Sequence, residues 1–240
     1  MERGNGGGAK AVVGEQYCED RERELTVRKT SLFFPGDGFV AYDHDSGDLV
    51  FRVDNYDRGP SLTDELVLMD PAGASILTLL RKWPSLHNRW EGYLGERAEG
   101  QKPRFTVRRS SIFGGDRAGV SVEVHGGDGD DAQTTMYRVD GSFAARCCQV
   151  LHEGNREEEE LVAEVKRKVD AVAQVVLGRD VFCLCLSPSA DAAFVMGLVL
   201  VLDRISGDDD VGAAVDPAAV APADVLEEHD GGSNGGGVHD

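Results

Sequence analysis

The feature of this 240-residue chain that most constrains its fold is an uncharged run of eleven residues, Ala192 to Leu202, with Asp191 and Asp203 at its two ends. A transmembrane helix needs about 20 apolar residues, so this run is too short to be a membrane anchor. It also contains no polar side chain that could face water, and a helix that is apolar all round has to be enclosed by protein. We therefore predict a buried helix over 190–205, with Ser189 as its N-cap and Asp191 in its first turn. The residues expected to form its core contacts are Phe194, Met196, Gly197, Leu198, Leu200 and Leu202.

Short runs of alternating apolar and polar residues, separated by turn residues, fill most of the preceding chain. In "DLVFRVDN", for example, Leu49, Phe51 and Val53 share one face, which is the pattern of a half-buried strand. The stretch "AVAQVVLG" (171–178) fits a short helix or a strand, and both interpretations stay open. About twelve strands are expected, at 24–30, 38–43, 48–55, 64–70, 74–82, 89–95, 104–110, 119–124, 134–140, 142–151, 160–169 and 180–186.

An internal repeat relates the two halves of this strand-rich region. "FRVDNY" begins at Phe51 and "YRVDGSF" begins at Tyr137, an offset of 86 residues, and Arg81 and Arg167 are again 86 residues apart. One offset shared by two separate stretches predicts two similar halves of about six strands each. Two such halves can close into a barrel without free edges, and a barrel of about twelve strands is wide enough to hold a helix. The predicted fold is therefore mainly β: a closed antiparallel barrel with the apolar C-terminal helix running through it.

The formal net charge of −18 is unevenly distributed along the chain. After Ser206 there are nine acidic residues and no Lys or Arg, and both ends of the chain are rich in Gly and poor in large apolar residues. Such composition is typical of disorder. We predict a disordered N-terminal tail over 1–21, one barrel domain over 22–206 and a disordered acidic tail over 207–240. The acidity argues against nucleic acid as a partner.

The five cysteines form no CxxC pair, and the chain begins without a signal-peptide core or a myristoylation site. This pattern favours a reducing, cytoplasmic setting, and it leaves peripheral association with the plasma membrane and entry into the nucleus open. Cys147 and Cys148 are expected to point to opposite faces of one strand. All five cysteines are expected to be small buried or half-buried side chains without a redox role.

Four basic clusters lie near the ends of predicted strands: Arg28–Lys29, Arg81–Lys82, Arg108–Arg109 and Lys166–Arg167–Lys168. They could gather on one rim of the barrel and bind anionic phospholipid through charge-assisted contacts. The alternative, which the pattern favours, is that they are solvated strand ends that discourage edge pairing. The repeat puts two of the clusters at matching points, but sequence does not tell whether these lie together or on opposite sides. The candidate lipid-binding residues are Arg81, Lys82, Arg108, Arg109, Lys166, Arg167 and Lys168.

No pattern of catalytic or metal-binding residues is present. His44, His87, His125 and His152 are scattered, and there is no HExxH or GxSxG motif. The acidic loops "DGDD" and "REEEE" lack the ligand spacing of a calcium site, and "FFPGDGF" is expected to be a turn. We predict no catalytic residue, no cofactor and no metal. Trp83 is expected to pack between strands or under a loop, with insertion at a membrane interface as the alternative.

Five long stretches carry a resemblance to a known family: "LTVRKTSLFFPGDGFVAYDHDSGDLVFRVDNY", "DELVLMDPAG", "RKWPSLHNRWEGYLGER", "RRSSIF" and "DAAFVMGLVLVLDRIS". They resemble the plant LURP-one-related family, which shares the tubby-like architecture with Tubby proteins and phospholipid scramblases. The resemblance extends from about Leu25 to Ser206. It implies a closed β-barrel around a C-terminal helix and, by analogy with the tubby-like relatives, tethering to phosphoinositides or membranes. The family name refers to a member upregulated in the response to an oomycete pathogen.

The basic clusters and this resemblance together predict a non-catalytic module that binds a phosphoinositide or an anionic membrane in plant stress or defence signalling. The alternative is a protein-interaction adaptor that uses the barrel surface or the acidic tail and binds no lipid. We expect a monomer without a transmembrane segment.

Overall fold

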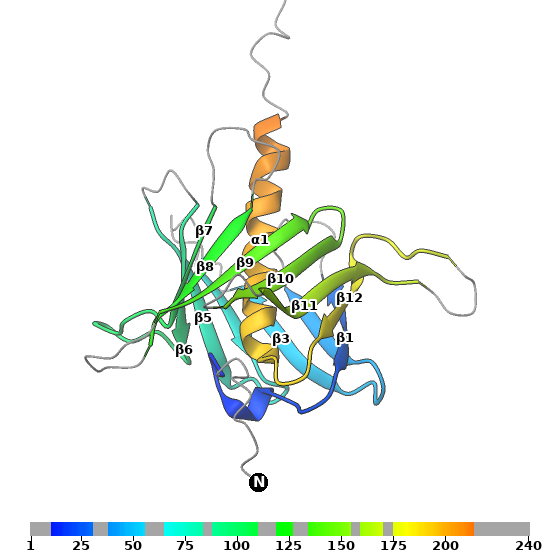
Figure 1. The fold of residues 1–240 in the computed structure, drawn as a ribbon, viewed down its shortest axis with the longest axis horizontal. Helices are drawn as coiled ribbons and strands as arrows, with labels where there is room; N and C mark the ends of the chain where they lie inside the picture. The colour runs from blue at the N-terminus through cyan, green and yellow to red at the C-terminus, as the bar shows by residue number, and fades with distance from the viewer. Residues whose placement is uncertain are drawn as a thin grey trace, which may run out of the picture.

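Twelve antiparallel strands close into a barrel in the computed structural model, and one helix runs through its centre (Figure 1). Each strand pairs with the next along the chain, and β12 pairs with β1 to complete the ring. The predicted fold is confirmed. The structure describes residues 11–30, 38–55, 65–83, 88–109, 119–126, 134–154, 159–169 and 175–213.

The strands found match the predicted ones closely. Eleven of the twelve begin within one residue of the predicted start. They are β1 (Arg23–Lys29), β2 (Phe39–Asp43), β3 (Leu49–Asn55), β4 (Glu65–Met69), β5 (Ser75–Arg81), β6 (Trp90–Leu94), β7 (Phe105–Arg109), β8 (Val120–Val124), β9 (Thr135–Ser142), β10 (Cys147–Glu153), β11 (Glu159–Arg167) and β12 (Val181–Leu186). Outside the described residues lie positions 33–37 of the turn expected over 33–39, the loop "DGDD", most of "REEEE", His87 and the chain ends 1–10 and 214–240.

The start of β10 is the exception, since it was predicted at 142 and lies at Cys147. The predicted strands 134–140 and 142–151 were divided at Gly141, but β9 continues through this glycine, which has φ 94°. A Cβ atom on Gly141 would lie 2.5 Å from the carbonyl oxygen of Cys147. The glycine therefore allows two strands to approach closely, and the turn itself occupies residues 143–146.

The helix α1 (Ala192–Ala213) is enclosed by the barrel over the whole uncharged run, because every residue from Ala192 to Leu202 is buried. The Phe194 ring meets those of Phe105 and Tyr137 edge-on, with centroids 5.2 and 5.0 Å apart. The six residues named for the core of this helix are all buried. At Gly197, a Cβ atom would lie 2.6 Å from Leu77 Cδ2, so this side chain of β5 packs directly against the helix backbone.

The beginning of α1 differs from the prediction. Asp191, not Ser189, is the N-cap, because Asp191 Oδ1 accepts a hydrogen bond of 3.0 Å from the backbone N–H of Phe194. Ser189 stands in the preceding turn with φ 63°. Asp caps a helix as well as Ser does, and it directly precedes the first helical residue. The helix also continues to Ala213, beyond the predicted boundary of the barrel domain at 206.

The second oxygen of Asp191 fastens the N-terminal segment across one mouth of the barrel. Asp191 Oδ2 accepts hydrogen bonds from the backbone N–H groups of Val12, Val13 and Gly14, at 3.0, 2.6 and 3.1 Å. Val12 is buried in the core, and the short 3₁₀ helix η1 (Glu15–Tyr17) follows. Residues 11–21, expected in the disordered tail, are therefore part of the fold. Their hydrogen-bond partner Asp191 is 179 residues from Val12 in sequence, so local composition gave no sign of this contact.

Asp203 holds the helix at the other mouth. Its carboxylate lies 3.2 Å from Lys29 Nζ and 3.6 Å from Arg146 Nη2. The Arg146 guanidinium is buried between the rings of Phe143 and Phe182, 4.1 and 4.5 Å from their centroids. The two carboxylates that end the uncharged run thus anchor the helix at the two openings of the barrel.

A charge placed in the enclosed part of α1 should unfold the domain. Leu198→Asp or Gly197→Asp would bury a carboxylate without a partner, so we expect a loss of about 4 kcal/mol or more of unfolding free energy. Urea denaturation followed by circular dichroism measures this loss. Leu161→Asp, on the partly exposed outer face of β11, is the matched control and should stay close to wild type. A wild-type melting curve for Leu198→Asp would show that the helix is not enclosed.

Asp191→Ala should release the N-terminal segment. The variant leaves four backbone N–H groups without their acceptor, so we expect the unfolding free energy to fall by about 3 kcal/mol. Amide hydrogen exchange at residues 12–14 should accelerate. Asp191→Asn keeps one acceptor oxygen, so its unfolding free energy should fall by less. Unchanged exchange at residues 12–14 in the alanine variant would contradict the role of this carboxylate.

Candidate functional site

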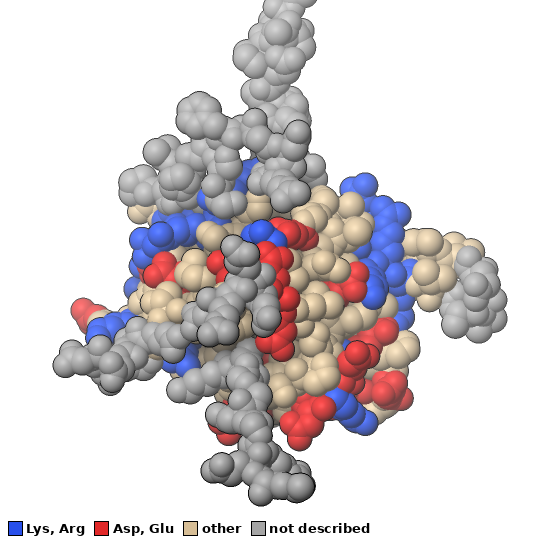
Figure 2. All heavy atoms as spheres, viewed as in Figure 1, with Lys and Arg blue, Asp and Glu red and all other residues tan. Residues whose placement is uncertain are grey.

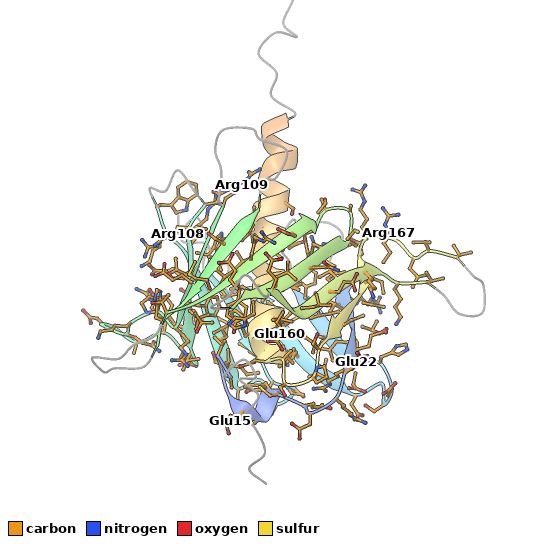
Figure 3. All side chains as sticks on the ribbon, in the orientation of Figure 1. Glu15, Glu22, Arg108, Arg109, Glu160 and Arg167 are labelled. Atoms are coloured by element: carbon orange, nitrogen blue, oxygen red, sulfur yellow. The ribbon has the colours of Figure 1, made fainter. Side chains whose placement is uncertain are left out.

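The topology brings all four basic clusters to one rim of the barrel. In an antiparallel ring, alternate strands run in the same direction, so the ends of odd-numbered strands share one rim. The clusters lie at the ends of β1, β5, β7 and β11, and we call this the basic rim. Figure 3 shows Arg108, Arg109 and Arg167 near this end of the molecule, with Glu15, Glu22 and Glu160 nearer the other.

The clusters on the basic rim form two separate groups. In the ring, β1 and β11 flank β12, while β5 and β7 flank β6. Because β5 and β11 are six strands apart in a ring of twelve, Arg81 and Arg167 lie on opposite sides of the barrel. The repeat of 86 residues therefore corresponds to a half-turn of the ring. Figure 2 shows one basic band at the upper right and another at the upper left.

The rim at the other end is acidic, which gives the barrel a charge polarity along its axis. Acidic residues gather at the lower right in Figure 2, around the start of β1 and the end of β2. Some of them are paired: Arg23 lies 3.0 Å from Glu19 and 2.9 Å from Asp43. Hydrogen bonds from the Ser46 backbone and from Arg23 lower the pKa of Asp43 to about 2.

In the β5–β7 group, basic side chains form ion pairs with an acidic side chain of the protein itself. Lys82 Nζ lies 3.0 Å from the carboxylate of Glu91, which also contacts Arg89 at 2.8 Å and accepts a hydrogen bond from the Tyr93 hydroxyl. Burial by itself would raise the pKa of Glu91, but the hydrogen bonds from Tyr93 and Lys82 and the nearby positive charges outweigh burial and lower it. Lys82 is therefore the partner of a buried carboxylate.

Arg81 and Arg108 also have partners in this group. Arg81 donates a hydrogen bond of 2.8 Å to Asn88 and stacks on the Trp83 ring at 4.2 Å. Arg108 lies 3.8 Å from Glu123. Trp83 is exposed and does not pack between strands as expected, so its interaction with Arg81 is a surface one.

In the β1–β11 group, the lysines have acidic partners. Lys168 Nζ donates a hydrogen bond of 2.8 Å to Thr26 Oγ1 and lies 3.6 Å from Glu24. Lys166 Nζ lies 2.7 Å from Glu164. Lys168 thus reaches back across β12 and joins β11 to β1.

Three arginines in the same group have no acidic partner within 4 Å among the described residues: Arg28, Arg167 and Arg179. Arg28 lies opposite Val181 and Arg167 lies opposite Phe182, on the two sides of the start of β12, and Arg179 lies two residues before that strand. All three are exposed. We call them the arginine group. Sequence reasoning missed Arg179 because it stands alone, and it named the lysines because it could not see their acidic partners.

Nothing among the described residues suggests a metal site, since no three His, Cys, Asp or Glu side chains are placed to hold an ion. Likewise, no helix in the described part of the chain is both long and apolar enough to span a membrane.

A closed barrel of twelve antiparallel strands threaded by a C-terminal helix defines a tubby-like protein. An X-ray structure of an Arabidopsis thaliana protein matches this fold with a TM-score of 0.57 and 26% sequence identity, covering 82% of this chain and 98% of the other.

The comparisons with known sequences agree with this class and narrow it. The sequence model of the LURP-one-related family matches residues 23–203. The chain is 57% identical over 200 residues to Protein LURP-one-related 5 of Arabidopsis thaliana, covering 82% of this chain and 90% of that protein. It is 52% identical over 204 residues to Protein LURP-one-related 12 of the same plant, covering 85% and 87%. The chain belongs to the LURP-one-related family, and these relatives support a plant origin.

The five thiols of the chain should differ sharply in reactivity. Cys147 is exposed, whereas burial raises the pKa of Cys18 to about 11, raises those of Cys148 and Cys183 to about 12, and raises that of Cys185. Since the thiolate is the nucleophile, we expect one rapid and four slow alkylations by iodoacetamide at pH 8, counted by mass spectrometry. Cys147→Ser should remove the rapid phase. A rapid thiol remaining in that variant would contradict the burial seen here.

Proposed function

We propose that this protein is a non-catalytic module that docks on anionic phospholipid surfaces through its basic rim, with the arginine group as the main contact. The observation that supports this most directly is that the fold collects four basic clusters on one rim and leaves Arg28, Arg167 and Arg179 without acidic partners among the described residues. A role in plant stress or defence signalling and a preference for phosphoinositides are part of the proposal, and both rest on the family resemblance.

The chemistry of the arginine group suits phosphate. A guanidinium offers two parallel N–H donors that match the oxygens of a phosphate, and it is more weakly hydrated than an ammonium group. Each basic residue near an anionic membrane surface contributes about 1 kcal/mol of binding free energy. The whole chain has a net charge of −18, so an anionic membrane would repel it in most orientations. The charge polarity of the barrel therefore favours a single orientation, with the basic rim toward the membrane.

The membrane should meet the side of the basic rim and not its centre. The helix α1 continues past Asp203 to Ala213 at this end of the barrel and extends beyond the strands in Figure 1. The sequence of that extension includes Asp208, Asp209 and Asp210. The helix backbone thus occupies the middle of the rim, and the arginine group lies to one side.

Flotation with liposomes tests the proposal. Vesicles with a phosphoinositide, with phosphatidylserine or with only neutral lipid would be mixed with the protein at about 0.1 M salt, where screening is realistic. We expect flotation with the anionic vesicles alone. Arg28→Glu/Arg167→Glu removes two phosphate contacts worth about 2 kcal/mol, so binding should weaken by about 30-fold or more. Lys168 is left unchanged because a glutamate there would face Glu24.

The control variant is Arg21→Glu/Arg97→Glu, which changes the net charge equally with two exposed arginines near the acidic rim. It should float like wild type. Equal losses in both variants would show a dependence on total charge and not on the basic rim. Competition by a soluble inositol phosphate separates recognition of one headgroup from recognition of the charged surface.

If the protein floats with none of these lipids, the proposal is wrong and the protein-interaction adaptor is favoured. Pull-down with the intact chain would then be the next experiment.

A further inference from the structure

The β11–β12 hairpin extends away from the barrel beside the arginine group. Thirteen residues separate β11 from β12, whereas eight separate the matching strands β5 and β6. Pairing continues past the strand ends through a bridge between Val169 and Val176, and the Leu177 N–H donates a hydrogen bond of 2.8 Å to the Lys168 carbonyl. In Figure 1 this hairpin projects sideways from the barrel.

The hairpin exposes apolar side chains where a soluble protein usually has polar ones. Val169, Val175 and Val176 are 49%, 57% and 49% exposed, and among large hydrophobic residues in the described part of the chain only Trp83, at 60%, is more exposed. Single exposed apolar residues are ordinary, but three on one hairpin, with Val169 bridged to Val176, suggest contact with an apolar partner.

The basic residues next to these valines indicate what kind of partner the hairpin contacts. The arginine group lies at the base of the hairpin, since Arg28 and Arg167 flank the start of β12 and Arg179 precedes it. Figure 2 shows the basic band at the right edge immediately beside the projecting element. Exposed valines beside a row of basic residues match the layers of an anionic bilayer, with phosphates at the surface and acyl chains below.

We infer that the β11–β12 hairpin inserts Val169, Val175 and Val176 into the outer layer of an anionic membrane while the arginine group contacts the lipid phosphates. This inference rests on the proposed function and adds the orientation of the barrel to it. The hairpin side faces the membrane, and the barrel axis does not point into it.

The inference also gives Trp83 no part in membrane contact. Trp83 follows β5, which lies across the ring from β11, and its ring is stacked on Arg81. With the hairpin against the membrane, Trp83 faces away from the bilayer. This makes Trp83 a matched control, because it is the other strongly exposed apolar side chain on the same rim.

A tryptophan placed in the hairpin tests insertion directly. Val176→Trp in a Trp83→Phe background leaves the buried Trp90 as the second fluorophore. With phosphatidylserine vesicles, we expect a blue shift of its emission and quenching by lipids brominated on the acyl chains. Trp83 in the otherwise unchanged protein should show neither effect.

Removal of the apolar side chains tests their contribution to binding. Val175→Ser/Val176→Ser should float about tenfold more weakly than wild type and keep the same salt dependence, because its arginine group is intact. Leu94→Ser/Leu161→Ser changes two comparably exposed apolar residues elsewhere and should bind like wild type. Melting temperatures of both variants check that the fold is unaffected.

The outcomes separate this inference from the proposed function. If wild type floats but the tryptophan in the hairpin is not quenched and Val175→Ser/Val176→Ser binds fully, insertion is wrong and the electrostatic proposal stands. If wild type fails to float with any anionic lipid, both are wrong.

Discussion

Between Ala192 and Leu202, α1 is surrounded on every side by the barrel, because none of its side chains could face water. Helix and barrel depend on each other. The helix needs a complete enclosure, and a ring of twelve strands needs a filled centre. Asp191 and Asp203 are twelve residues apart, which corresponds to about 18 Å of helix. Each carboxylate therefore reaches a different mouth of the barrel, where backbone N–H groups or basic side chains meet it.

The same ring of strands creates the charge polarity on which the functional proposal rests. Basic clusters follow the odd-numbered strands, and antiparallel pairing carries all of them to one rim. A basic residue on that rim is not always free to bind a ligand, however. Lys82 neutralises the buried Glu91, and Lys168 joins β11 to β1 through Thr26. The arginines near the start of β12 are different, because no carboxylate of the described residues lies within 4 Å of their guanidinium groups.

Much of the architecture could be predicted because its signals are local or periodic. Alternation located the strands, and Phe51 and Tyr137, at one offset, occupy β3 and β9, six strands apart. The errors have physical causes. The predicted strands were divided at Gly141, although this glycine lies within β9 and allows a close approach between strands. Ser189 was a reasonable cap in sequence, but Asp191 stands next to the helix and takes that role. Of the candidate site, the basic clusters were found, whereas Arg179 was missed for lack of a basic neighbour.

By itself, the sequence determined the closed barrel, its two similar halves and the enclosed helix, since each follows from a pattern of apolar residues along the chain. Only the tertiary structure decided which charges are engaged and which remain exposed. That depends on pairs such as Lys168 with Thr26, 142 residues apart, and Val12 with Asp191, 179 apart. Contacts between such distant residues leave no local pattern, because hydrogen bonds and ion pairs depend on distances in space, which here are set by the register of the barrel.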